Sequence, residues 1–288
     1  MTYAFPAWFA ALLCGAALSA PAFAQSSTGG QQVQVGDMRM HYEEVGAGDA
    51  LVLLHGFGGC GREWRAQAVR LAADYRVIMP DLRGHGGSTN PSDAFTHRQA
   101  AADLSALLDR LGVDRFKAIG ISSGGMTLLH MATREPARVE AMVLVGTAHY
   151  FPEQARAITR RAAEAGPRLA DLDYFRQCAT RGETQVDALA RQFAGFATSA
   201  GDVDFSPRSL GGIRARTLIV HGDRDEFFPP DIPVAMHAAI PDSALWIVPG
   251  GAHVPIHGAR AQAFEDEVLH FLRDAPGAGG VAPSRPPR

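Results

Sequence analysis

Gly120-Ile121-Ser122-Ser123-Gly124 matches G-x-S-x-G, a pattern that places a serine on a sharp turn between a strand and a helix. Residues 116–119 are predicted as the strand, and residues 125–131 have helical spacing. Glycines on both sides of Ser122 let the strand and helix pack closely around a strained turn. The five residues are also compatible with a plain Gly/Ser turn without chemistry, so the rest of the chain decides.

The overall composition indicates a globular protein. The chain has 288 residues, of which 47% are hydrophobic, and its net charge is −3. This content supports one large domain, or one domain with an insert, around an ample core. Because Lys and Arg form no runs, the charge gives no footprint for nucleic acid. We therefore expect a small-molecule substrate and no nucleic-acid partner.

Both ends of the chain differ from this globular composition. Residues 7–20 are apolar and rich in small side chains, and Ala22-Phe23-Ala24 resembles a signal-peptidase site. The apolar run is too short to span a bilayer, so residues 1–24 are predicted as a signal peptide rather than a stable membrane anchor. A lipid anchor on Cys14 is disfavoured by the bulky Leu13 before it. We expect a periplasmic or secreted protein with a disordered tail at residues 274–288.

Short apolar runs alternate with helical stretches along most of the chain. Strands that are apolar on nearly every residue suit a mostly parallel sheet buried on both faces, with helices covering both sides. Gly36-Asp37 is expected to turn a hairpin between the first two strands. The predicted strands are Gln31–Val35, Met38–Val45, Ala50–Leu54, Arg76–Met79, Phe116–Gly120, Val139–Val145, Thr217–Val220 and Ala244–Val248.

The alternation breaks over residues 147–207, which contain no convincing strand. Val186, Leu189, Phe193 and Phe196 share one helix face there, either as ordinary packing or as part of a cap. We predict that this segment is a helical cap inserted into a core formed by residues 25–146 and 208–273. The predicted helices are Glu63–Ala73, His97–Leu111, Gly125–Arg134, Pro152–Ala165, Asp171–Ala179 and Gln262–Leu272.

A nucleophilic serine needs a base and an acid that orients the base. His253 lies just past the last predicted strand, where sites in open α/β sheets form. Its rival His257 is closer to the following helix. Asp225, after the preceding strand, is preferred over Asp223 because it is further from the strand end and can reach back to the histidine. We therefore predict Ser122, Asp225 and His253 as catalytic residues.

Acyl transfer also needs hydrogen-bond donors for the oxyanion. The candidates are the backbone N–H groups of Ser123, directly after the nucleophile, and of Phe57, in the loop after Ala50–Leu54. His253 and His257 are spaced like a metal pair, but no H-E-x-x-H motif and no third ligand accompany them. We expect neither a metal nor a cofactor.

The order of these motifs resembles that of the α/β-hydrolase superfamily, in its cap-bearing serine hydrolases. The resemblance spans residues 31–273 and implies an α/β-hydrolase fold, the triad in the order Ser122, Asp225, His253, and Phe57 and Ser123 at the oxyanion. Serine at position 122 argues against the dehalogenase and epoxide hydrolase relatives that use Asp. The motifs that carry the resemblance are His55-Gly56-Phe57-Gly58, Asp81-Leu82-Arg83-Gly84-His85-Gly86-Gly87-Ser88, the serine turn, Gly222-Asp223-Arg224-Asp225 and Gly251-Ala252-His253.

The resemblance implies a serine hydrolase of the carboxylesterase kind. A C–C bond hydrolase, an aminopeptidase and a perhydrolase share the triad and remain alternatives. Two interpretations belong to other classes: a non-catalytic binding protein on this fold, and a dinucleotide-binding oxidoreductase. The latter rests on G-x-G-x-x-G at residues 56–61, with Asp81 twenty residues on. Against it, a hairpin precedes the strand, and the fingerprint leaves Ser122, Asp225 and His253 unexplained. Asp81 and His85 are expected to be structural, in a loop folded by its glycines and held by side-chain hydrogen bonds.

Two cysteines, Cys60 and Cys178, remain after the signal peptide. Export would place them in an oxidising compartment, where a disulfide could tie the loop of Phe57 to the cap. Two separate thiols are the preferred interpretation, because a disulfide requires the two Cα atoms to lie within about 7 Å.

Overall fold

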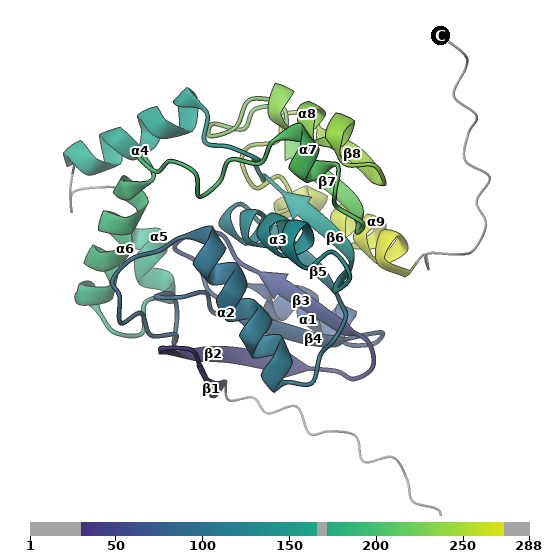
Figure 1. Ribbon diagram of the computed structural model, residues 1–288, viewed down its shortest axis with the longest axis horizontal. Coiled ribbons are helices and arrows are strands. Elements are labelled where there is room, and N and C mark those ends of the chain that lie inside the picture. Colours follow the sequence, from purple (N-terminus) through teal and green to yellow (C-terminus); the bar gives the residue numbers. More distant parts are fainter. Residues whose placement is uncertain (1–29, 166–171, 274–288) are drawn as a thin grey trace, which may run out of the picture.

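The protein is described by a computed structural model that covers residues 30–165 and 172–273 (Figure 1). Its centre is a sheet with the strand order β1-β2-β4-β3-β5-β6-β7-β8. β2 pairs antiparallel with β1 and β4, whereas every other neighbouring pair is parallel. This confirms the predicted mostly parallel sheet. The predicted signal peptide and C-terminal tail lie outside the described residues.

Each predicted strand is present, and its ends differ from the prediction by no more than two residues. Gly36, at the predicted hairpin turn, has a φ of +54°, which a residue without a Cβ adopts without cost. The strands are β1 (Gln31–Val35), β2 (Met38–Val45), β3 (Ala50–Leu54), β4 (Arg76–Pro80), β5 (Phe116–Ile121), β6 (Val139–Val145), β7 (Arg216–Gly222) and β8 (Ser243–Val248).

The sheet is buried on both faces, as the continuous apolar runs predict. In β3, Leu51 and Leu53 belong to one hydrophobic cluster and Val52 and Leu54 to the other, because side chains alternate between faces along a strand. Helices α1 and α9 supply the first cluster, and α2, α3 and α8 supply the second. The helices outside the cap are α1 (Arg65–Leu71), α2 (His97–Arg110), α3 (Ser123–Arg134), α7 (Pro207–Leu210), α8 (Asp231–Ala239) and α9 (Ala261–Arg273).

Three helix predictions need correction. The predicted helix Glu63–Ala73 is a 3-10 turn, Gly61–Trp64, followed by the shorter α1. Helix α3 begins at Ser123 rather than at Gly125, so the serine turn leads directly into it. Helix α8 was not predicted because prolines precede it and Pro233 lies inside it; that proline falls in the first turn, where no hydrogen bond is lost.

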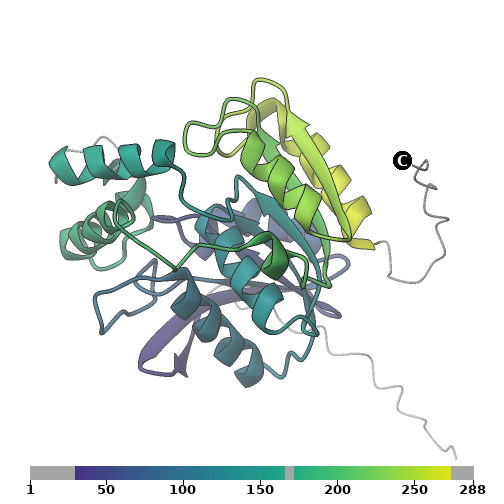
Figure 2. The ribbon, with the colours of Figure 1, turned by 45° about the horizontal axis from the view of Figure 1, so that its top comes forward.

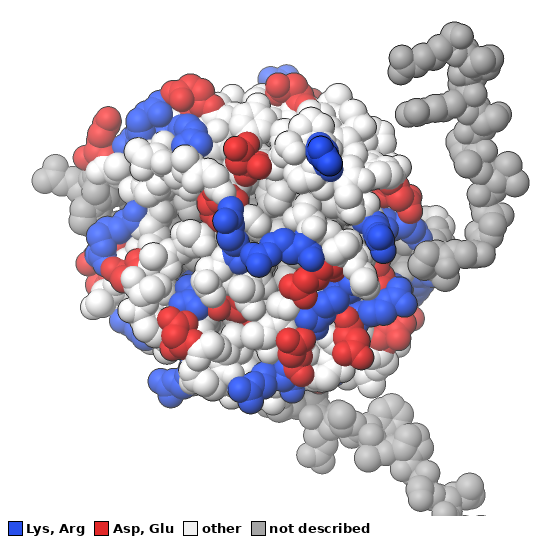
Figure 3. Space-filling view, in the orientation of Figure 1, with Lys and Arg blue, Asp and Glu red and all other residues white. Residues whose placement is uncertain are grey.

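The segment between β6 and α7 contains α4 (Glu153–Ala165), α5 (Leu172–Cys178) and α6 (Glu183–Gly195). Figures 1 and 2 show these helices gathered on one side of the sheet, away from α9. The chain enters and leaves this segment side by side, where Tyr150 and Asp204 form an isolated antiparallel bridge. We call residues 147–207 the cap segment. On the face shown in Figure 3, acidic and basic side chains are interspersed between wide uncharged areas.

Candidate active site

The serine turn joins β5 to α3, and it holds Ser122 at φ +50° and ψ −113°. A positive φ is uncommon for a residue with a side chain, so this backbone is strained. A Cβ at position 120 would lie 2.6 Å from the Gly125 nitrogen, and one at position 124 would lie 2.6 Å from the Leu54 carbonyl oxygen. Both glycines of the motif are therefore required for the close approach of strand and helix.

His253 and Asp225 come from the loops after β8 and β7, two neighbouring strands of the sheet. His253 Nδ1 lies 2.9 Å from Asp225 Oδ2, and the Asp225 side chain is 0% exposed. Asp225 Oδ1 accepts the N–H groups of Phe227 and Phe228 at 2.8 and 3.0 Å. Burial alone would raise the pKa of the Asp225 carboxyl, but the hydrogen bonds from His253 and these amides hold it below its usual value. The ionised carboxylate makes Nδ1 the donor and leaves Nε2 as the basic nitrogen.

The structure separates the predicted residues from their rivals. His257 is exposed and lies outside the cavity that contains His253. Asp223 makes no hydrogen bond to a histidine ring among the described residues, and its Oδ1 is buried without a partner. The structure thus brings Asp225, not Asp223, to His253.

One cavity of about 230 Å³ has both Ser122 and His253 in its wall. Within the described part of the chain, no hydrogen bond joins these two side chains. Among residues 30–165 and 172–273, the cavity lining is strongly aromatic and contains no Lys, Arg, Asp or Glu. Its aromatic residues are Phe57, Phe151, Tyr174, Phe175, Phe193, Phe196, Phe227 and Phe228.

The helix face singled out in the sequence divides between packing and the cavity. Val186 and Leu189 are buried in the core, whereas Phe193 and Phe196 line the cavity. Sequence reasoning missed Phe151 and Phe175, which also come from the cap segment, because isolated phenylalanines carry no periodic signal. The cap segment therefore forms much of the cavity wall.

The two predicted oxyanion donors both lie in this wall. Among the described residues, no acceptor receives the N–H of Phe57 or of Ser123. Ser123 is the first residue of α3, and the N–H groups of a first helical turn have no partner inside the helix. Both amides are therefore available to an oxygen bound beside Ser122.

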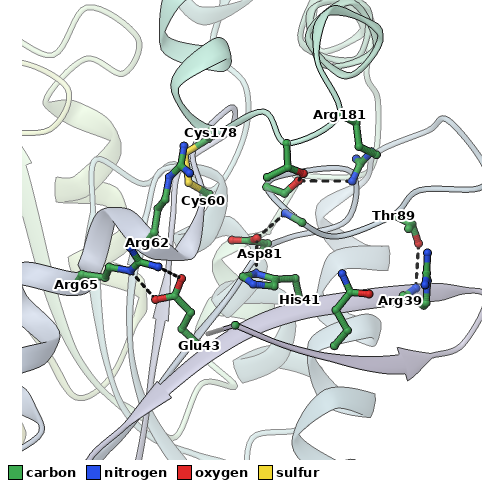
Figure 4. Close-up of a pocket in the computed structure, with 15 residues that line it drawn as sticks. Arg39, His41, Glu43, Cys60, Arg62, Arg65, Asp81, Thr89, Cys178 and Arg181 are labelled. Carbon is green, nitrogen blue, oxygen red and sulfur yellow. Dashed lines mark hydrogen bonds and ion pairs between the residues drawn. A yellow bond between two sulfur atoms is a disulfide. The ribbon is translucent and has the colours of Figure 1, made fainter. Parts of the chain in front are cut away.

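Cys60 and Cys178 form a disulfide, with their Cα atoms 5.7 Å apart. The preferred interpretation of two separate thiols is thus wrong. The bond connects the loop of Phe57 to the end of α5, and the sequence could not give this proximity because 118 positions separate the two cysteines. Figure 4 shows the disulfide in the wall of a second cavity, of about 510 Å³.

This second cavity is lined by arginines and does not contain Ser122. Asp81 lines this cavity, and one of its carboxylate oxygens accepts the Gly61 N–H at 2.7 Å. The other oxygen contacts His41 Nδ1 and the Gly87 N–H. Asp81 therefore fixes the glycine-rich loops, as the structural interpretation predicts, and each of its carboxylate oxygens already accepts a hydrogen bond from the protein.

No group of three or more His, Cys, Asp or Glu side chains is placed to hold a metal ion in residues 30–165 and 172–273. Over the same residues, no helix is long and apolar enough to cross a membrane.

Comparison with known proteins gives relatives of several activities. The family model described as "alpha/beta hydrolase fold" matches residues 49–192. A Synechocystis protein named "Putative non-heme chloroperoxidase" is 30% identical, over 81% of this chain and 95% of its own length. A 2-hydroxy-6-oxo-6-phenylhexa-2,4-dienoate hydrolase of Burkholderia cepacia is 28% identical, over 82% of this chain and 92% of its own length.

Among solved structures, a thermophilic esterase from Thermogutta terrifontis is 26% identical with a TM-score of 0.69. The match covers 84% of this chain and 98% of the esterase chain. The sheet order and the serine turn agree with these comparisons. The chain belongs to the α/β-hydrolase superfamily of enzymes.

Proposed function

We propose that this hydrolase is a carboxylesterase that cleaves esters of uncharged, apolar acids through an acyl-enzyme on Ser122. One observation carries the proposal: in the part of the chain that the structure describes, the cavity that contains Ser122 and His253 is lined by phenylalanines and has no Lys, Arg, Asp or Glu. A charged substrate group would enter this cavity without a partner, which costs several kcal/mol or more. An apolar acyl group would gain about 25 cal/mol for each Å² that it buries.

The reaction follows from the arrangement of the groups. Ser122 Oγ attacks the ester carbonyl while His253 Nε2 takes the hydroxyl proton of Ser122. Asp225 holds the imidazole by its Nδ1–H and stabilises the imidazolium. The N–H groups of Phe57 and Ser123 stabilise the oxyanion. His253 then protonates the leaving alcohol, and a water molecule activated by the same histidine releases the acid.

The same cavity disfavours the alternatives that share the triad. The dienoate of the Burkholderia relative carries a carboxylate, which would need a cation, and the described residues of this lining include none. An aminopeptidase would need a carboxylate to bind the substrate's ammonium group. The similarity to a chloroperoxidase keeps perhydrolysis, in which peroxide replaces water at the acyl-enzyme, as a second outcome of the same site.

A matched pair of substrates tests the proposal. p-Nitrophenyl butanoate and the p-nitrophenyl monoester of succinic acid present acyl groups of four carbons, and only the second has a terminal carboxylate. We expect kcat/KM to be about 100-fold or more higher for the butanoate, because a buried carboxylate without a partner is costly. Faster cleavage of the succinate, of a dienoate C–C substrate or of an aminoacyl p-nitroanilide would contradict the proposal.

We also propose that the protein is exported and begins at Gln25 after cleavage. The small-residue site Ala22-Phe23-Ala24 supports this, and so does the Cys60–Cys178 disulfide, since such bonds persist in oxidising compartments. Fractionation of bacteria that express the full chain, with N-terminal sequencing of the product, tests it. Recovery of the uncleaved chain in the cytoplasmic fraction would contradict it.

A further inference from the structure

A second chain of Ser, His and Asp side chains lies next to the candidate triad. Ser123 Oγ is 3.0 Å from His97 Nε2, and His97 Nδ1 is 2.8 Å from Asp202 Oδ2. The His97 ring is 0% exposed, and Ser123 is 3% exposed. The three residues come from α2, α3 and the end of the cap segment. The proposed reaction uses none of these side chains.

Asp202 is held at the N-terminus of α2. Its carboxylate accepts the backbone N–H groups of His97 and Arg98 at 2.9 and 3.1 Å. Burial would raise the Asp202 pKa, but the hydrogen bonds from His97 and these amides lower it to about 2. The Asp202 carbonyl also contacts His130 Nε2, on α3, at 2.8 Å. Asp202 therefore fixes the cap segment to both helices.

These contacts determine the direction of the hydrogen bonds. An ionised Asp202 can only accept, so His97 Nδ1 must donate to it. In the neutral ring, Nε2 then accepts the hydroxyl proton of Ser123. The Ser123 side chain is thereby held in one orientation. The backbone carbonyl of Ser123 also accepts a hydrogen bond from Thr127 Oγ1 at 2.8 Å.

We propose that His97 and Asp202 are positioning residues of the oxyanion hole, which hold Ser123 so that its backbone N–H points at the oxyanion. The inference rests on the proposed acyl-enzyme function. It gives each oxyanion donor a connection to the cap segment: the loop of Phe57 through the disulfide, and Ser123 through His97 and Asp202. Movement of the cap segment would therefore change the position of both donors.

The test compares two inhibitors of equal alkyl length. A trifluoromethyl ketone adds to the nucleophile and forms an oxyanion, whereas the methyl ketone mimics the bound substrate. In Ser123→Ala, His97→Gln and Asp202→Asn, we expect Ki for the trifluoromethyl ketone to rise about 10- to 100-fold, which is the effect of a small displacement in an active site. Ki for the methyl ketone and KM for the ester should stay within about twofold of the values of the unchanged protein. The value of kcat should fall by about the factor by which Ki for the trifluoromethyl ketone rises.

Two further measurements exclude a merely structural role. The double variant Ser123→Ala/Asp202→Asn should lose no more than the worse single variant, because residues of one chain act together. His41→Gln removes a histidine–aspartate contact of the same 2.8 Å length at the second cavity, and it should leave both Ki values unchanged. Ser123→Ala removes one hydroxyl group only, so the test stands if the other variants do not fold.

The outcomes separate the inference from the proposed function. A fluorophosphonate should label Ser122 in the unchanged protein; no labelling would overturn the proposed function and this inference with it. If Ser122 is labelled, three results would overturn the inference alone. They are equal changes in both Ki values, no change in either Ki value, and additive losses in the double variant.

Discussion

Ser122 and Ser123 are neighbours, and each belongs to a set of one serine, one histidine and one aspartate. Both serines line the same cavity, and the sets differ in backbone and in the exposure of the histidine. Ser122 has a positive φ, and its histidine is 14% exposed. Ser123 is helical and buried, its histidine is 0% exposed, and every step of its chain is a closed hydrogen bond.

The difference shows that the three residue types do not by themselves make a nucleophile. Both serines line the cavity, but among the two histidines only His253 lines it as well, so a substrate carbonyl bound there meets Ser122 and its base together. Ser123 instead lies in the first turn of α3, and its hydroxyl contacts a histidine ring that has no exposed surface. The first set is therefore arranged for reaction, and the second for holding a neighbouring amide in place.

The largest expected effect separates the two serines. Ser122→Ala should lower kcat for p-nitrophenyl butanoate by about 10⁴-fold or more, because it removes the nucleophile. Ser123→Ala should lower it by only about 10- to 100-fold, since the nucleophile remains and one donor is displaced. Steady-state kinetics of both purified variants measure this, with mass spectrometry of a fluorophosphonate adduct as the control. An adduct on Ser123 would reverse the assignment.

Substitutions of the two aspartates should differ in the same order as those of the two serines, with the larger loss of kcat in the first set. Asp225→Asn should lower kcat by about 10⁴-fold, because the neutral amide neither fixes the tautomer of His253 nor stabilises its imidazolium form. Asp202→Asn should cost about 10- to 100-fold, because it acts on geometry alone. Steady-state kcat measurements with circular dichroism as a folding control decide this. Equal losses in the two variants would mean that the second set takes part in proton transfer.

Sequence patterns were sufficient for the sheet and for the expectation that the side chains of the first set lie close together. Continuous apolar runs identified each strand, and the positions of Ser122, Asp225 and His253 just past strand ends indicated one edge of the sheet. These features are local, because a strand or a strand-to-helix turn is specified by adjacent residues. Parallel pairing then brings the strand ends together.

The second set and the disulfide could not be predicted in the same way. His97 and Asp202 are 105 positions apart, and no turn or strand end marks either of them. Their contact exists only because the cap segment returns across the N-terminus of α2. The sequence contains Cys60 and Cys178 but does not indicate the distance between them. The choice between a disulfide and two separate thiols therefore depended on the path of the cap segment.

The disulfide allows the two connections to the cap segment to be compared. Cys60→Ser/Cys178→Ser should lower the free energy of unfolding by roughly 2–5 kcal/mol, because the bond closes a long loop in the unfolded chain. Its effect on kcat should be smaller than that of Asp202→Asn, since Phe57 stays packed against Phe196 and Phe175 without the bond. Urea unfolding and kinetics measure both quantities. A greater loss of kcat than in Asp202→Asn would make the disulfide the main support of the oxyanion hole.

The smallest expected effect is a change in acid stability that identifies the ionised Asp202. Its pKa is about 2 in the folded protein and near 3.8 in an unfolded chain, so the unfolded state binds its proton first as the pH falls. The stabilisation is complete above about pH 4 and is lost between about pH 4 and pH 2. The free energies of unfolding of the unchanged protein and of Asp202→Asn should therefore converge over this range.

A neighbouring residue provides the control for this titration. Asp204 lies two positions along the chain with its side chain exposed, so Asp204→Asn should follow the unchanged protein at every pH. His130 contacts the Asp202 backbone carbonyl, and burial lowers its pKa to about 4 although the Asp202 charge raises it. Differences between the curves of Asp202→Asn and the unchanged protein therefore report the Asp202 charge together with its contact to His130. Parallel curves for Asp202→Asn and the unchanged protein would show that this carboxyl is not ionised against His97, and the second set would lose the charge that fixes its hydrogen bonds.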